Sequence, residues 1–156
     1  MRKRSKYRPK KVLANPVGFV LEGLTPLAKH EDALINLKVK HHYAMAALTQ
    51  GKATRDDMDR LINMANMAEA MFRLGFGTDY ADVITNGMPA LLAVCRRGAE
   101  TNRFILKSEE MKAINQLLEL HDAQLEVTTV KDVERGIALV ENERRNKRMS
   151  NIIERK

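Results

Sequence analysis

The stretch ATRDDMDRLINMANMAEAMFRLG, residues 53–75, indicates the fold most directly. Its apolar residues recur at intervals of three and four, which places them on one face of an α-helix. Thr54 is a favourable N-cap, and the two aspartates that follow it place negative charge in the first helical turn. Gly75 is suited to end the helix. The expected buried face consists of Met58, Leu61, Ile62, Ala65, Ala68, Met71 and Phe72.

The same period of apolar residues appears on both sides of this stretch. Residues 30–51 predict a helix that ends at Gly51, and a connection of only a few residues makes it the antiparallel neighbour of the first. A further helix is expected from Thr78 or Asp79 to about residue 106. Asn86, Gly87 and Pro89 are expected to divide that helix into a short and a longer piece.

Two more helices are expected in the remaining chain. Ser108 begins one of them, and the β-branched run at 127–130 ends it. Thr129 and Asp132 then resemble a capping box at the start of the last helix. That last helix is expected to bury Val133, Ile137 and Val140.

The chain as a whole is predicted to be all-α, an antiparallel bundle of about five helices. No stretch alternates apolar and polar residues over enough length to require a strand. At 156 residues with 44% hydrophobic residues, the chain suits a single domain. We expect a basic arm and connector at 1–26, the helical bundle at 27–150 and a tail at 151–156.

The first eleven residues, MRKRSKYRPKK, carry seven positive charges and no negative charge. The net charge of the whole chain is +7, and residues 12–156 contain 20 positive and 20 negative residues. The arm is expected to be disordered, because its charges repel one another and prolines interrupt any helix. The apolar residues expected to fix the connector to the bundle are Val17, Phe19, Val20, Leu21 and Leu24.

Few residues suggest enzyme chemistry or a bound metal. The histidines lack the spacings of di-iron and zinc motifs, and His41 and His121 fall at helix-face positions typical of interfacial histidines. Cys95 lies among apolar residues, which predicts a buried, unreactive thiol. No apolar run approaches the roughly 20 residues of a membrane span. We therefore expect no enzyme activity, no cofactor, no metal and no membrane partner.

Methionine is concentrated in the 53–75 stretch, at positions 58, 64, 67 and 71. Methionine fills irregular gaps in a core, and it also serves adaptable binding surfaces. The core interpretation is favoured, and a partner groove or a dimer interface remains the alternative.

The arm has the charge pattern of a segment that binds the phosphate backbone of DNA or RNA. Contacts to phosphates release counterions, which rewards dense positive charge. Tyr7 can stack on a base, and Arg8 can hydrogen-bond a phosphate or a guanine edge. The C-terminal basic residues share this interpretation, although the helix dipole also explains cations there. The candidate nucleic-acid-binding residues are Arg2, Lys3, Arg4, Lys6, Tyr7, Arg8, Lys10, Lys11, Arg144, Arg145, Lys147 and Arg148.

The start KRSKYRPKKVLANP, followed by a helical body with acidic helix starts, is similar to small uncharacterised proteins encoded by tailed phages and prophages. This resemblance implies residence in the cytoplasm of a bacterial host or in a virion, and implies no particular activity. The favoured interpretation is a non-enzymatic accessory protein that binds nucleic acid nonspecifically through its arm. The alternative is a helical protein-interaction module: a host-protein adaptor or inhibitor, or a virion component, with a protein partner or a homodimer.

Overall fold

The computed structural model describes residues 23–146. Within that range the chain is helical and forms no strand, only an isolated bridge between Pro26 and Thr129. The prediction of an all-α bundle of about five helices is confirmed. The elements are the 3₁₀ turn η1 (Leu27–Lys29), α2 (Glu31–Thr49), α3 (Arg55–Arg73), the 3₁₀ turn η2 (Thr78–Tyr80), α4 (Ala81–Thr101), α5 (Ser108–Val127) and α6 (Val130–Arg145).

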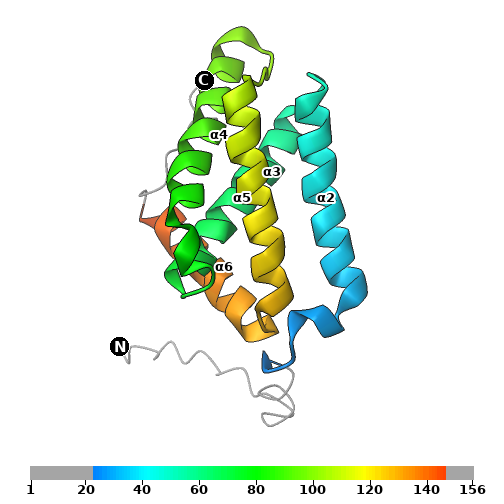
Figure 1. Ribbon diagram of the computed structural model, residues 1–156, viewed down its shortest axis with the longest axis vertical. Helices are drawn as coiled ribbons and strands as arrows, with labels where there is room; N and C mark the ends of the chain where they lie inside the picture. Colours follow the sequence, from blue (N-terminus) through cyan, green and yellow to red (C-terminus); the bar gives the residue numbers. More distant parts are fainter. Residues whose placement is uncertain (1–22, 147–156) are drawn as a thin grey trace, which may run out of the picture.

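Helices α2 to α5 run alternately up and down, so the α2–α3 and α4–α5 connectors lie at the same end of the bundle (Figure 1). Helix α6 lies across the opposite end and packs against α3. The core fills the space between α2, α3, α4 and α5. Met58, Met64 and Met71 are fully buried there, within one chain, together with Leu48, Leu61, Val94, Ile114 and Leu117.

The predicted N-cap at Thr54 and the predicted capping box at Thr129 are both confirmed, and Thr54 also forms a capping box. The Asp57 main-chain N–H donates to Thr54 Oγ1 (3.2 Å), and the Thr54 N–H donates back to Asp57 Oδ2 (2.9 Å). Thr129 and Asp132 repeat the arrangement at α6. The predicted cap at Thr78 or Asp79 was wrong, because these residues form η2 and α4 begins only at Ala81.

The predicted division of α4 was also wrong. Helix α4 is continuous from Ala81 to Thr101 and includes Pro89. A proline inside a helix removes one main-chain hydrogen bond, but both halves of α4 pack on α5 and keep the same direction. Gly87 is essential to this packing, because a Cβ there would lie only 2.8 Å from the Leu117 Cβ.

Helix α6 packs differently from the prediction. Of its residues only Gly136 is buried, while Val133 and Val140 are half-buried and Ile137 is 44% exposed. The reason is the close approach of α6 to α3: a Cβ on Gly136 would lie 3.0 Å from both Met67 Cε and Met71 Sδ. The contact therefore centres on the glycine, and the larger apolar residues lie at its margin.

Main-chain hydrogen bonds hold the described start of the chain to the α5–α6 junction. The Leu27 N–H donates to the Thr128 carbonyl (2.9 Å), and the Val130 N–H donates to the Thr25 carbonyl (3.1 Å). Leu24, which was expected to fix the connector by burial, is 56% exposed. The other four, Val17, Phe19, Val20 and Leu21, lie outside the described residues.

Candidate nucleic-acid interface

Most of the residues that the sequence assigns to nucleic-acid binding fall outside the described range. These are the eight arm residues Arg2, Lys3, Arg4, Lys6, Tyr7, Arg8, Lys10 and Lys11, together with Lys147 and Arg148. The structure places Arg144 and Arg145, which lie in the last turn of α6.

The last turn of α6 is electrically balanced. Arg145 pairs with Glu141 across 3.6 Å and is 77% exposed, whereas Arg144 lies over α3, with its Nη2 3.4 Å from Asn63 Oδ1. Glu143 is bound by Arg73, which also pairs with Glu69 (2.8 Å). These glutamates raise the pKa of Arg73 through hydrogen bonding. Two arginines and two glutamates therefore share this turn, so Arg144 and Arg145 bring no excess positive charge on their own.

The described bundle as a whole also carries no excess positive charge. Residues 23–146 contain 16 Lys and Arg and 18 Asp and Glu, a net charge of −2, while the whole chain carries +7. Residues 1–22 and 147–156 together therefore carry +9. The positive charge of this protein is segregated into the two terminal segments, which flank a slightly acidic bundle.

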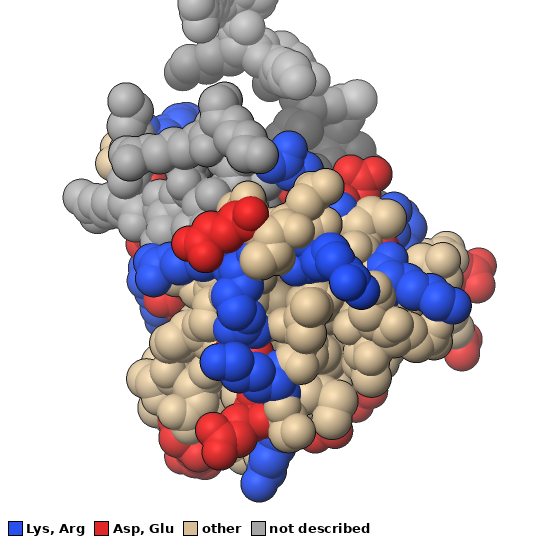
Figure 2. Space-filling model, turned by 90° about the horizontal axis from the view of Figure 1, so that it is seen from above, with Lys and Arg blue, Asp and Glu red and all other residues tan. Residues whose placement is uncertain are grey.

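The structure also reveals a cationic surface that the sequence analysis missed. The α2–α3 and α4–α5 connectors and the first residues after them present four exposed cations, Lys52, Arg55, Arg103 and Lys107. We call this surface the basic end. In a view onto this end of the molecule, Lys and Arg side chains form a band across the face, with Asp and Glu on either side (Figure 2). Neither residues 50–55 nor residues 101–107 contain an acidic residue.

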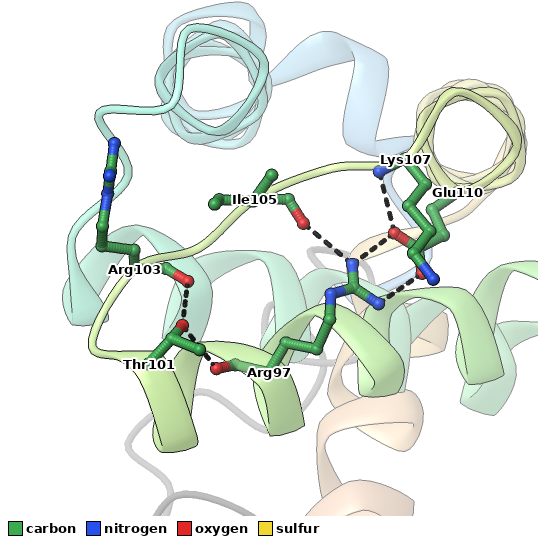
Figure 3. Close-up of polar contacts among 6 residues, drawn as sticks. All are labelled: Arg97, Thr101, Arg103, Ile105, Lys107 and Glu110. Atoms are coloured by element: carbon green, nitrogen blue, oxygen red, sulfur yellow. Dashed lines mark hydrogen bonds and ion pairs between the residues drawn. The ribbon is translucent and has the colours of Figure 1, made fainter.

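A hydrogen-bonded clamp holds the α4–α5 connector in place (Figure 3). The Arg97 guanidinium donates to both carboxylate oxygens of Glu110 (2.7 and 2.5 Å) and to the Ile105 carbonyl (2.8 Å). Glu110 in turn accepts from the Lys107 main-chain N–H (3.0 Å). The hydrogen bond from Arg97 holds the pKa of Glu110 below its usual range, so the pair stays ionised at neutral pH.

Packing reinforces the clamp. Asn102 ends α4 in the left-handed conformation (φ 57°) and turns the chain back toward α5. The ring of Phe104 then lies directly on Gly98, where an added Cβ would be 2.1 Å from Phe104 Cδ1. Arg103, Ile105 and Lys107 are exposed and alternate with the half-buried Phe104 and Leu106, as an extended segment requires. The connector therefore presents Arg103 and Lys107 to solvent from a fixed backbone.

Two histidines are buried between α2 and α5. The rings of His41 and His121 are 5.5 Å apart, and the Nδ1 atom of each lacks a hydrogen-bond partner among the described residues. Burial lowers the pKa of both, that of His121 to about 4. The predicted interfacial position is confirmed, and both rings are neutral at pH 7, so they cannot serve as anion contacts.

The described part of the chain contains no reactive cysteine, metal site or membrane-spanning helix. Cys95 is buried as predicted, and burial raises the pKa of its thiol to about 11, which keeps it protonated. Residues 23–146 contain no group of three His, Cys, Asp or Glu side chains arranged to hold a metal ion. None of the helices described is long and apolar enough to cross a bilayer.

The chain matches no protein-family model, no curated protein and no solved structure. One feature of the sequence could have predicted the basic end, namely the charge of two connectors. In an up-and-down bundle the first and third connectors lie together, and here both carry only positive charge.

Proposed function

We propose that this protein is a non-enzymatic accessory protein that binds nucleic acid nonspecifically through its basic arm, residues 1–11. The observation that carries the proposal is charge segregation: the described bundle has a net charge of −2, whereas the arm alone carries +7. A charge density of this kind gains nothing from folding, and it gains free energy by releasing counterions from a phosphate backbone.

The composition of the arm indicates the mode of binding. The arm contains one aromatic residue, Tyr7, and its other contacts are cationic, so most of the affinity comes from phosphates. Phosphate contacts carry little sequence information, which makes the binding nonspecific. The resemblance to phage-encoded proteins supports a setting in a bacterial cytoplasm or a virion.

Binding to random duplex DNA, single-stranded DNA and RNA tests this proposal by fluorescence anisotropy at 50 and 200 mM salt. If most of the seven arm charges contact phosphates, the slope of log affinity against log salt approaches about −6. Affinity then falls about a thousandfold or more between the two salt concentrations. Removal of residues 1–11 is expected to abolish measurable binding.

A length-matched control separates the charge of the arm from its bulk. In this variant all Lys and Arg of residues 1–11 are replaced by Gln, and its affinity is expected to match that of the deletion. Equal, salt-insensitive binding by the full chain and both variants would remove the proposal.

A second candidate function is supported by the outer surface of α2. Ile35, Val39 and Tyr43 are spaced four residues apart and are 49%, 58% and 66% exposed. They form an apolar ridge on the side of α2 that faces away from the bundle, opposite the buried Leu34, His41 and Met45. The ridge is symmetric about Val39, so an antiparallel second copy of α2 would place apolar residues against apolar residues along its whole length.

This second candidate, a protein-interaction module that associates with itself, predicts a concentration-dependent dimer. Val39→Glu would place a charge at the centre of the ridge and is expected to shift the dimer to monomer in sedimentation experiments. Lys40→Glu, on a neighbouring exposed position, is the matched control and should leave association unchanged. A monomer at all concentrations up to the millimolar range would exclude the candidate.

A further inference from the structure

We infer that the basic end of the bundle is a second contact surface for the phosphate backbone of the nucleic acid that the arm binds. The inference rests on the proposed function and extends it from the arm to the folded domain. It concerns Lys52, Arg55, Arg103 and Lys107, which come from two connectors about 50 residues apart in sequence.

Two of the acids close to the connectors are engaged in helix starts. Asp57 is buried and bonds Thr54 in the α3 cap, with Arg60 3.3 Å away. Glu110 is held by Arg97 and by the Lys107 main chain. These two carboxylates stabilise helix starts and are compensated by Arg60 and Arg97. Lys52, Arg103 and Lys107 form no salt bridge with the described residues, although the exposed Asp56, Glu100 and Glu109 flank the two connectors.

The α4–α5 connector has a fixed geometry. A mobile loop would lose conformational entropy on binding, whereas a pre-organised one does not. Arg97 fixes the Ile105 carbonyl, and Thr101 Oγ1 lies within 3.1 Å of the Arg103 carbonyl oxygen (Figure 3). Phe104 packs on Gly98 and anchors the segment on α4. The backbone that carries Arg103 and Lys107 is therefore already ordered before any ligand arrives.

The span of the bundle is close to one turn of duplex DNA. The described chain begins at Gly23, beside Lys131 at the start of α6, at the end of the bundle opposite the basic end. The length of α2, 19 residues, separates the two ends by about 30 Å. One turn of duplex DNA is about 34 Å long. A nucleic acid lying along the bundle can therefore reach from the end where the described chain begins to the basic end.

The test compares two sets of substitutions in the full-length chain, with the arm intact. The first variant is Lys52→Gln, Arg103→Gln, Lys107→Gln; the control is Lys29→Gln, Lys40→Gln, Lys131→Gln. Each removes three exposed positive charges, so the net charge changes equally. Circular dichroism and thermal melting verify that both variants fold like the parent.

Anisotropy titrations with a random 20-base-pair duplex are then made across a range of salt concentrations. The first variant is expected to reduce the magnitude of the salt slope by about 2–3, since each lost phosphate contact removes about 0.9. Its affinity at 50 mM salt should fall about tenfold or more, while the control changes the slope by less than about 1.

The outcomes separate this inference from the proposed function. Equal weakening of both variants would overturn the inference, and so would an unaffected first variant, while loss of binding on arm deletion would still support the proposed function. An unmodified protein that binds no duplex would overturn both. Loss of binding to polyglutamate but not to DNA in the first variant would assign the surface to an acidic protein, against the inference.

Discussion

Lowering the pH from about 7 to about 4 is expected to reduce the free energy of unfolding by about 3 kcal/mol through His121 alone. Burial, and secondarily the neighbouring His41, hold the folded-state pKa of His121 at about 4, below its ordinary value of 6.5. Between these two values the unfolded chain binds more protons than the folded chain, so acid favours unfolding. The contribution is complete above about pH 6.5 and is lost as the pH falls toward 4.

Other groups around the ring do not cancel this effect. His42 and Lys38 on α2 lie at the edge of the same interface and are paired with Asp122 and Glu126 of α5, each across 2.6 Å. The carboxyl of Asp122 attracts a proton to the histidines, but burial outweighs it for both rings. Since the pKa of His41 is also lowered, its protonation adds to the loss of stability.

Urea unfolding at several pH values provides the measurement. His121→Leu keeps a similar volume and removes the titrating group, so its stability is expected to decline much less between pH 6.5 and 4. The exposed His30 offers a matched control, and His30→Gln should retain the parent's decline. If the parent and His121→Leu lost the same stability over this range, protonation of the buried ring would not be the cause.

Replacing glycine by alanine is expected to destabilise the protein at Gly87 but not at Gly136. Gly87→Ala should lower the free energy of unfolding by about 2 kcal/mol, because overpacking costs more than the roughly 1 kcal/mol gained in helix propensity. The added Cβ would lie 2.8 Å from the Leu117 Cβ and 3.2 Å from the Ala113 carbonyl oxygen. Neither atom can move without shifting the backbone of α5.

Gly136→Ala is the matched control, since it makes the same chemical change in another buried helical position. Its Cβ would meet only the flexible ends of Met67 and Met71, at 3.0 Å. Methionine repacks readily, so the variant should be neutral or stabilised by up to about 0.5 kcal/mol. Denaturant midpoints with unchanged slopes measure both effects. Equal destabilisation of the two variants would show that α4 and α6 are equally closely packed against their neighbours.

The helix starts were the most predictable features of this chain. Thr54 with Asp57 and Thr129 with Asp132 lie within four residues of each other, and their hydrogen bonds depend on local sequence alone. Pro89 and Gly87 were misjudged because a local rule weighs one lost hydrogen bond and cannot weigh the packing of α4 on α5. The exposure of Ile137 likewise depends on how closely Gly136 lets α6 approach α3.

The candidate interface, too, could be predicted from the sequence only in part. The arm could be recognised from the sequence because seven of its eleven residues are positively charged. Its role remains a prediction because it lies outside the described residues. The basic end joins Lys52 to Arg103, which only the antiparallel arrangement of four helices brings to one end. Its rigidity depends on Arg97 and Glu110, whose pairing requires the turn at Asn102.

The way α6 is attached has a consequence for the order in which the molecule opens. Helices α2 to α5 share one core, whereas α6 buries a single glycine and contacts chiefly α3. Undocking α6 uncovers Met67 and Met71 but leaves the core between α2, α3, α4 and α5 in place, so the four-helix core can outlast α6 as a separate cooperative unit. Amide hydrogens of α6 should exchange with solvent by this local opening, well before those of α3 and α5, which require global unfolding.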